Sequence, residues 1–558
     1  MKIYKGIAGA PGIVSGKILY YEKKNVNSAE KRGIDEAVAA ASARIDKLME
    51  KAKKEFGDDK AKIFSAYKML LEDPMLTEPI KAEIEAGKEP VAAITDISES
   101  MASILASKGN EYMKQRADDI RYIGKILSDA VLGIENEFSF PDDDEKYIIA
   151  AHELTPVDTM LFDRNRLAGF VTEKGGATSH TVILAKSIGI PAVVGADGIK
   201  EADGCEAYLD GYGGTLAVDA DGDDRKKYEE LLKSERELEK KLEDIKQSDA
   251  YTACGERIKV AVNIGKPSDL KDADGERFDG VGLFRSEFLY SSSDKKPSED
   301  EQKNAYKNVL DSVYPGTVTI RTIDVGGDKK IDYLGMKDEE NPFLGMRGIR
   351  LCLENTDIFS EQLAAIIEAG AGKSVKIMLP MICSVSEIDK TRELINTVRE
   401  KLIKSGREVC ENVMLGIMIE TPASAVTADV FAKKCDFFSI GTNDLVQYIT
   451  AADRGNEQVE NVYNPYHPAV IRLLNHVIKS GNDAGIEVSV CGDLAANTDF
   501  TEVLIGMGLR KLSVPIPMVS RIKHKISTID IKAAEQTAKK ALAAENENQV
   551  KRILRKED

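Results

Sequence analysis

The carboxyl-terminal half of this 558-residue chain alternates short apolar runs with longer amphipathic stretches. Apolar runs bounded by Gly, Pro or Asp are typical of buried strands, whereas the stretches between them repeat apolar residues every three or four positions, as helices do. Eight such runs follow residue 250: "IKVAVNIG", "GVGLFRSEF", "VTIRTIDVGG", "FLGMRGIR", "SVKIMLPMI", "VMLGIMIET", "FFSIGTND" and "VSVCGDLA". Residues 251–558 are therefore expected to form a (β/α)8 TIM barrel, with catalytic side chains at the carboxyl ends of its strands.

The residues before the barrel carry two kinds of pattern. From about residue 29 to residue 143 apolar residues recur with helical spacing, which predicts a helical bundle. Strand-like runs punctuated by Gly and Pro surround it. We expect an α/β domain made of residues 1–21 and 144–221, with residues 22–143 inserted as the bundle. The charge-rich residues 222–250 predict a linker helix.

Composition excludes several classes of function. The formal net charge of −17 disfavours nonspecific binding to nucleic acid or to anionic membranes. No apolar stretch approaches the roughly 18 residues of a membrane-spanning helix, and the amino-terminal residues lack the apolar core of a signal peptide. We expect a cytoplasmic protein without membrane insertion. The 7 cysteines are scattered and include no CxxC pair, which argues against a disulfide framework and against a cysteine zinc site.

Three arginines are predicted to follow strands of the barrel: Arg285, Arg321 and Arg347. Lys329 lies just beyond the third of the eight runs. Guanidinium groups present planar pairs of donors to phosphate or carboxylate, so several of them at one barrel mouth indicate a small polyanionic ligand. The alternative is that each arginine pairs with a neighbouring acid such as Glu287 or Asp324.

Two acidic residues, Glu420 in "MIET" and Asp444 in "GTND", end adjacent predicted strands. Two carboxylates together with substrate oxygens are a usual way to hold Mg²⁺. A phosphorylated substrate would complete the coordination shell. The alternative is a pair of solvated loop acids.

Cys491 in "VSVCGDLA" ends the last of the eight runs. A buried structural thiol is the commoner fate of a cysteine, but a position at the barrel mouth favours a catalytic role. Cys383 in "LPMICS" also lies near a predicted strand end.

His180 in "KGGATSHTVILAKSIGI" is placed in the first turn of a predicted helix, after two glycines. The free N–H groups and the positive end of a helix disfavour imidazolium, which keeps the ring nucleophilic, and would stabilise a phosphate added to it. This pattern is compatible with a phosphohistidine. The alternative is an ordinary capping or surface histidine.

"GGATSHTVILAKSIGIPAVVG" resembles the phosphohistidine motif of phosphoenolpyruvate-utilising enzymes, with His180 at the phosphorylated position. Other motifs are similar to the enzyme I family of the phosphotransferase system, so the resemblance covers nearly the whole chain. They include "GIAGAPGIVSGK", "MLLEDP", "RADDIRYIGK", "GVGLFRSEFLY", "RTIDVGGDK", "ENPFLGMRGIR", "MIETPAS", "FFSIGTNDLVQY", "AADRGN" and "VCGDLA".

This resemblance implies phosphoryl transfer from phosphoenolpyruvate to His180, and then to a histidine of the small carrier protein HPr, which docks on the helical insert. Glu420 and Asp444 would hold Mg²⁺, and Cys491 would protonate the enolate to give pyruvate. The resemblance assigns substrate binding to Arg285, Arg321, Arg454 and Asn443. A swivelling phosphohistidine domain and a homodimer formed through the barrel are also implied.

The chain departs from the family pattern at Ala177, where Arg is common, at Asp493, where Glu is common, and near Tyr67, where the insert usually carries His. The last change predicts altered carrier recognition. Two alternatives remain: a regulator that binds phosphoenolpyruvate without turnover, and a relative of phosphoenolpyruvate synthase or pyruvate phosphate dikinase. The second needs an ATP-binding domain, for which the residues before the histidine loop leave little room.

Overall fold

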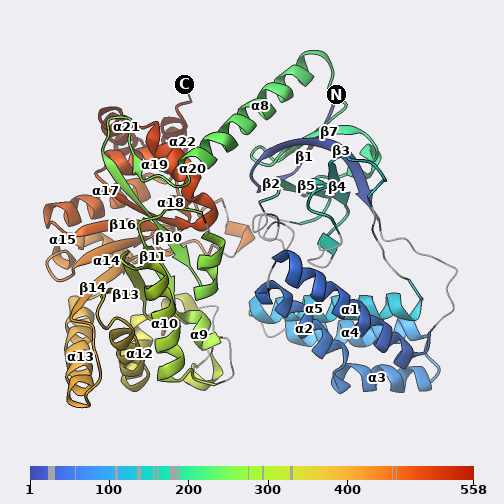
Figure 1. Cartoon of the computed structure of the whole chain (residues 1–558), viewed down its shortest axis with the longest axis horizontal. Helices are drawn as coiled ribbons and strands as arrows, with labels where there is room; N and C mark the ends of the chain where they lie inside the picture. Colours follow the sequence, from blue (N-terminus) through green and yellow to red (C-terminus); the bar gives the residue numbers. More distant parts are fainter. Residues whose placement is uncertain are drawn as a thin grey trace. The chain divides into compact units, whose positions relative to one another are not determined.

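The structure is a computed structural model whose described residues form two compact units, Met1–Leu238 and Glu239–Asp558 (Figure 1). Within these residues no helix combines the length and the hydropathy that crossing a bilayer requires. The residues that the structure does not describe are 23–31, 57, 107–110, 135–137, 139, 155–157, 160–161, 176–181, 183–184, 186–188, 274, 292–294, 327–330, 338, 455, 460 and 558.

The first unit contains a mixed sheet with the strand order β1-β8-β7-β3-β4-β5-β6-β2 among its described residues. Neighbours from β3 to β6 pair in parallel, and the other pairs are antiparallel. Strands β4 and β5 are buried along their whole length, as strands covered on both faces are. The strands are β1 (Lys2–Lys5), β2 (Ile7–Ala10), β3 (Ile13–Tyr21), β4 (Tyr147–Ala151), β5 (Leu167–Thr172), β6 (Ala192–Val194), β7 (Glu206–Asp210) and β8 (Thr215–Val218).

A helical bundle interrupts this sheet between β3 and β4, as the sequence predicted. Ala41, Ile45 and Leu48 of the first helix are buried in the bundle core, together with Ile123 and Leu127 of the last. Their spacing of three and four residues places them on one face of each helix. The helices are α1 (Ile34–Phe56), α2 (Asp58–Leu71), α3 (Pro74–Glu85), α4 (Pro90–Ala106) and α5 (Glu111–Val131). The charged helix α8 (Gly222–Ile245), also predicted, has no buried residue.

The second unit is a closed barrel of parallel strands, because β10 pairs in parallel with both β11 and β17. A short strand, β9 (Ala250–Tyr251), adds to β10 in antiparallel orientation. The barrel strands are β10 (Arg257–Ile264), β11 (Val281–Arg285), β12 (Val318–Arg321), β13 (Ser374–Leu379), β14 (Asn412–Ile419), β15 (Phe437–Gly441), β16 (Glu487–Cys491) and β17 (Lys511–Pro515). The predicted TIM barrel is thus confirmed.

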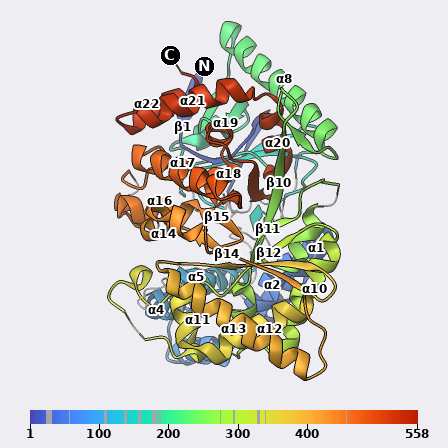
Figure 2. The ribbon, with the colours of Figure 1, turned by 90° about the vertical axis from the view of Figure 1, so that its left-hand side faces the viewer.

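Helices surround the barrel strands in both views (Figures 1 and 2). Two long ones begin at capping boxes, Ser298 with Glu301 and Ser384 with Glu387, in which side chain and backbone exchange hydrogen bonds. The helices are α9 (Glu287–Ser291), α10 (Glu299–Val313), α11 (Ile349–Glu354), α12 (Thr356–Ala369), α13 (Val385–Lys404), α14 (Pro422–Val426), α15 (Ala428–Phe431), α16 (Thr442–Thr450), α17 (Pro468–Asp483), α18 (Asp493–Ala496), α19 (Thr498–Gly506), α20 (Val519–Ser527), α21 (Ile531–Ala543) and α22 (Glu547–Arg555).

One of the eight predicted barrel strands is wrong. The run "FLGMRGIR" is not a strand: it contains a loop and the start of α11, and Gly348 has a φ of 59°, which extended strands do not use. The eighth strand is instead β17, in "KLSVP". The hairpin of β7 and β8 was also missed, although alternating apolar residues around "GYGG" were a signal for it.

The amino-terminal end of the barrel is closed by a charge cluster that we call the barrel floor: Glu487, Lys259, Lys376 and Lys511. Glu487 Oε1 accepts hydrogen bonds from Lys376 Nζ at 2.7 Å and from Lys511 Nζ at 2.8 Å. Lys259 Nζ lies 3.3 Å from Glu487 Oε2. The side chains of Lys376 and Lys511 are only 7% and 5% exposed. One carboxylate therefore compensates two buried ammonium groups.

Candidate active site

Most residues predicted from the sequence lie at the carboxyl end of the barrel, where the ends of parallel strands converge. Arg347 also contacts this end of the barrel, but it precedes α11 instead of ending a strand. His180, Ala177 and Lys329 lie outside the described residues. The others are Arg285 at the end of β11, Arg321 at the end of β12, Glu420 directly after β14, Asn443 and Asp444 in the first turn of α16, Arg454 after α16, and Cys491 at the end of β16.

Arg321 is buried among carboxylates. Its Nη2 donates to Glu287 Oε1 at 2.8 Å, and its Nη1 lies 2.9 Å from Asp324 Oδ2. Burial alone would lower the pKa of Arg321, but these two carboxylates hold it above its usual value. Its Nε is buried without a hydrogen-bond partner among the described residues. The ion pairing raised as an alternative is therefore present, and one donor remains for a ligand.

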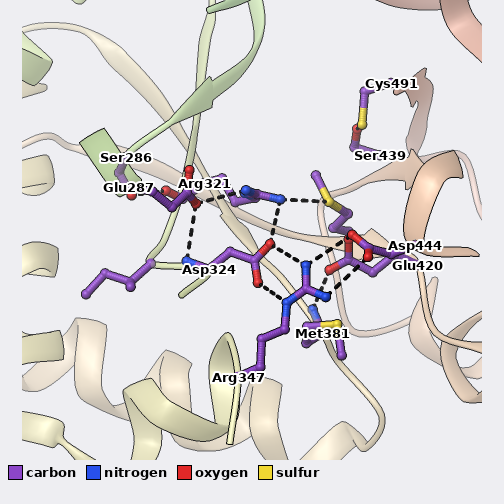
Figure 3. Close-up of polar contacts among 12 residues, drawn as sticks. Ser286, Glu287, Arg321, Asp324, Arg347, Met381, Glu420, Ser439, Asp444 and Cys491 are labelled. Carbon is purple, nitrogen blue, oxygen red and sulfur yellow. Dashed lines mark hydrogen bonds and ion pairs between the residues drawn. The ribbon is translucent and has the colours of Figure 1, made fainter. Parts of the chain in front are cut away.

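Arg347 bridges two carboxylates (Figure 3). Its Nε and Nη2 donate to Asp324 at 3.0 and 3.1 Å. Its Nη1 and Nη2 donate to Asp444 at 3.2 and 3.1 Å. Burial acts to lower the pKa of Arg347, but both carboxylates outweigh it and raise the pKa. This pair of bidentate contacts connects the loop after β12 with the start of α16.

Glu420 has no exposed surface, and its two oxygens have different surroundings. Oε1 accepts the N–H of Met381 at 2.6 Å, whereas Oε2 is buried without a hydrogen-bond partner in the part of the chain that the structure describes. Burial, then Asp324 and Asp444, raise the pKa of Glu420 to about 8. Met381 has a φ of 59°, a strained conformation of the kind that gathers at functional sites. An unpaired buried carboxylate oxygen is suited to a cation.

Asn443 connects two loops at this end of the barrel. Its Oδ1 accepts the N–H of Asp493 at 2.8 Å, which ties the start of α16 to the start of α18. Thr442 Oγ1 donates to the carbonyl of Cys491 at 3.0 Å, from the same turn of α16. Asp493 thus contacts Asn443 through its backbone.

The Cys491 thiol is buried inside the barrel. It accepts a hydrogen bond from Ser439 Oγ at 3.3 Å and donates one to the carbonyl of Ile440 at 3.4 Å. Burial raises the pKa of Cys491, so the thiol stays protonated at neutral pH. A protonated thiol at this position is able to act as a proton donor.

The outer part of the site is formed by exposed arginines. Arg285 and Arg454 are both exposed, in contrast to Arg321 and Arg347. Arg454 is held through its backbone, whose N–H donates to Gln447 Oε1 at 3.1 Å. Of the cationic side chains predicted for this mouth, the four arginines that the structure describes divide into a buried pair, Arg321 and Arg347, and an exposed pair, Arg285 and Arg454.

Asp324 was predicted to lie at a strand end and to be a possible partner of the arginines, and in the structure it is central to the site. It contacts both buried arginines, and its N–H donates to Glu287 Oε1 at 3.2 Å. The contact of the Met381 backbone N–H with Glu420 was not predicted. No sequence signal marks a single backbone donor, whereas the spacing of Asp324 three residues after Arg321 was visible in "RTID".

Three family models match the chain. They are described as PEP-utilising enzyme, N-terminal, over residues 5–116; PEP-utilising enzyme, mobile domain, over residues 143–214; and PEP-utilising enzyme, PEP-binding domain, over residues 239–531. The last model alone covers more than half of the chain.

The phosphoenolpyruvate-protein phosphotransferase of Bacillus subtilis is 40% identical to this chain, over 99% of the chain and 98% of the relative. That of Staphylococcus carnosus is 36% identical, over 98% of each. A solution structure of enzyme I (nEIt) is 34% identical and covers 41% of this chain and 98% of that one, with a TM-score of 0.36. The chain belongs to the phosphoenolpyruvate-utilising enzymes, in the family of the phosphoenolpyruvate-protein phosphotransferases.

Proposed function

We propose that this protein transfers the phosphoryl group of phosphoenolpyruvate to its own His180 and then to a histidine of an HPr-type carrier protein, with release of pyruvate. This is the first step of sugar uptake by the phosphotransferase system, a reaction of the cytoplasm. The observation that supports it most is the cluster of buried arginines and carboxylates at the barrel mouth, which shares that mouth with a protonated buried thiol. Phosphoryl transfer depends mainly on positioning and on neutralising charge, which such a cluster supplies.

Phosphoenolpyruvate carries a phosphate and a carboxylate, and the arginines of the mouth are suited to both. The unpartnered Nε of Arg321 is a buried donor for one of them. Arg285 and Arg454 are exposed and can adapt to the remainder of the ligand. We assign substrate binding to Arg285, Arg321, Arg347, Arg454, Asn443, Asp444 and Lys329.

Glu420 and Asp444 are the residues that would hold Mg²⁺. Hard carboxylate oxygens suit this ion, and the buried, unpartnered Oε2 of Glu420 fits a cation better than it fits solvent. Substrate oxygens and water would complete the coordination shell around these two carboxylates. Bound Mg²⁺ would neutralise charge on the phosphate and on the forming enolate.

Cys491 is assigned the protonation of the enolate. When the bond from phosphorus to the enol oxygen breaks and a bond to His180 forms, an enolate of pyruvate is left. Its methylene carbon takes a proton from the Cys491 thiol, whose raised pKa keeps that proton available at neutral pH. The product is pyruvate, and the thiolate regains a proton from solvent.

His180 must meet both the barrel mouth and the carrier, which implies a swivelling movement of the α/β domain. We assign that domain to residues 1–21 and 144–221, the carrier-binding insert to 22–143, the linker to 222–250, and a barrel that also forms a homodimer to 251–558. Tyr67 is only 3% exposed and packs edge-on against Phe64, so its own side chain cannot contact a carrier. Altered carrier recognition would have to come from its exposed neighbours.

Replacing His180 with alanine is expected to abolish labelling of the protein. The full chain is incubated with Mg²⁺ and phosphoenolpyruvate carrying labelled phosphate, without ATP, and acid-labile phosphoprotein and pyruvate are measured. No phosphohistidine can form without the imidazole. The matched control is His152→Ala, since His152 is an exposed histidine of the same unit that contacts Glu173; it should keep the label.

Label that survives in His180→Ala would contradict the assignment of the nucleophile. Binding of phosphoenolpyruvate by the wild type without label or pyruvate would favour a regulator without turnover. A requirement for ATP would instead favour a relative of the phosphoenolpyruvate synthases.

A further inference from the structure

Arg347 uses all of its N–H donors within the protein, and Figure 3 shows those that contact Asp324 and Asp444. A guanidinium has about five such donors. In addition to the four contacts with Asp324 and Asp444, Nη1 lies 3.3 Å from the hydroxyl of Tyr448. A substrate can therefore bind to Arg347 only if one of these contacts is released.

The Asp324 side of Arg347 is the anchored side. Asp324 is 4% exposed, also pairs with Arg321 at 2.9 Å, and is tied through its N–H to Glu287. Releasing Arg347 there would leave a buried carboxylate in the middle of this network, which is costly.

The Asp444 side is the exchangeable side. Among the described residues, the side-chain hydrogen bonds of the Asp444 carboxylate are the two from Arg347. Asp444 is also one of the two carboxylates to which we assign the divalent cation. A guanidinium and a divalent cation that bind the same buried carboxylate repel each other strongly. The distance between the two positive charges is short, and the low dielectric constant of the interior weakens their repulsion less than water would.

We propose that Arg347 and the divalent cation bind Asp444 in alternation. In the metal-free protein Arg347 holds Asp444, as in the structure. When the cation takes Asp444, Arg347 stays anchored on Asp324 through Nε and Nη2. The N–H groups of Nη1 and Nη2 that pointed at Asp444 are then released beside the cation, where substrate phosphate would lie. Metal binding thus creates a phosphate donor pair that the metal-free site lacks.

This inference rests on the metal site of the proposed function, and metal binding alone tests it. The affinity of the full chain for Mn²⁺ is measured by titration calorimetry and by the electron paramagnetic resonance of free Mn²⁺, without phosphoenolpyruvate. Arg347→Met removes the competitor and is expected to bind Mn²⁺ roughly tenfold more tightly than the wild type, the effect of releasing a charge-assisted hydrogen-bonded pair. Glu420→Gln is expected to lose this site.

Two further variants separate competition from a general change of charge. Arg454→Met removes one positive charge from the same mouth, but Arg454 is exposed and so is screened by water; its Mn²⁺ affinity should stay within about twofold of the wild type. Arg347→Lys keeps the charge but lacks the planar donor pair, and should bind Mn²⁺ with an affinity between those of wild type and Arg347→Met. If Arg347→Met does not fold, Arg347→Lys tests the competition in its place.

If both Arg347 variants bind Mn²⁺ no more tightly than the wild type does, the alternation is overturned. The metal site itself would still stand in that case, provided that the wild type binds Mn²⁺ more tightly than Glu420→Gln does. If the wild type binds no more Mn²⁺ than Glu420→Gln, the metal site itself fails and the alternation fails with it. Labelling at His180 is measured separately, so failure of the phosphotransfer proposal is distinguishable from both results.

Discussion

Replacing Cys491 with alanine is expected to lower the rate of pyruvate formation by about two to four orders of magnitude, the usual contribution of a positioned general acid. The thiol is buried and protonated at the barrel mouth, and its loss leaves the enolate without a proton donor from the protein. Pyruvate is measured with phosphoenolpyruvate and Mg²⁺ in single turnover, so that the carrier does not limit the rate.

Cys383→Ala is the matched control for this experiment. Cys383 follows β13 at the same end of the barrel and donates to the carbonyl of Met381 at 3.6 Å, but its thiol is half-buried in a different loop. Its replacement should leave the rate within about threefold. Cys491→Ser, which preserves size and hydrogen bonding, should remain slow because a hydroxyl is a much weaker acid than a thiol. A fast serine variant would show that Cys491 is only structural.

The raised pKa of Cys491 also gives the direction of a pH effect. Its usual pKa is about 8.5, and burial moves it upward, so the thiol remains protonated through neutral pH. Wild-type pyruvate formation should therefore fall only on the alkaline side of that value, and the alanine variant should lack this alkaline loss.

Replacing Glu487 with glutamine is expected to destabilise the barrel by about 3 kcal/mol, the effect of removing one partner from a buried ion pair. The neutral amide would leave the repulsion between the ammonium groups of Lys376 and Lys511 uncompensated. The free energy of unfolding is measured from the denaturant transition of the barrel. The control is Glu400→Gln, the same change in an exposed pair with Lys404, which should cost no more than about 0.5 kcal/mol.

The pH dependence of that variant has a defined sign. Already in the wild type, burial lowers the pKa of Lys511 more than Glu487 raises it. Without Glu487 the folded variant therefore holds this proton still less tightly than the unfolded chain does. Stability of the variant should then rise with pH up to the usual lysine pKa of about 10.4.

In the wild type, burial alone would raise the pKa of Glu487, but the two buried lysines outweigh it and lower the pKa. Its contribution is complete above the unfolded value of about 4.3 and is lost as pH falls below it. A destabilisation below about 1 kcal/mol would contradict the structural role of the barrel floor.

Most of the fold was predictable because its elements carry strong local periodicity. The buried strands of the barrel and the helices of the insert are long enough for the pattern to be unambiguous. "FLGMRGIR" failed because an apolar run of that length is compatible with a strand, a loop or a helix start, and its glycines decide against the strand. "KLSVP" was missed because its strand begins with a lysine that points into the barrel floor.

The site residues at strand ends were predictable because the barrel topology brings those ends together. Arg347 was predicted as part of the mouth for a wrong reason, since a loop and not a strand carries it there. The contacts that define the site were not predictable: the double role of Asp324 and the unpartnered Glu420 Oε2 depend on side-chain geometry that residue spacing does not reveal. The roles of all these residues stay predictions, and the positions of His180 and Lys329 do so as well, because both lie outside the described residues.

The parallel pairing of β3 with β4 restricts how the helical insert can change in evolution or by engineering. Lys17 is opposite Tyr147 and Tyr21 is opposite Ala151, so the chain leaves β3 at one end of this strand pair and must enter β4 at the opposite end, roughly 15 Å away. A crossover connection is therefore required between β3 and β4, and the bundle lies within it. The bundle can be exchanged for another crossover, which would give a chimera with a different docking surface. The connection cannot be shortened to a tight turn without loss of the parallel pairing of β3 with β4.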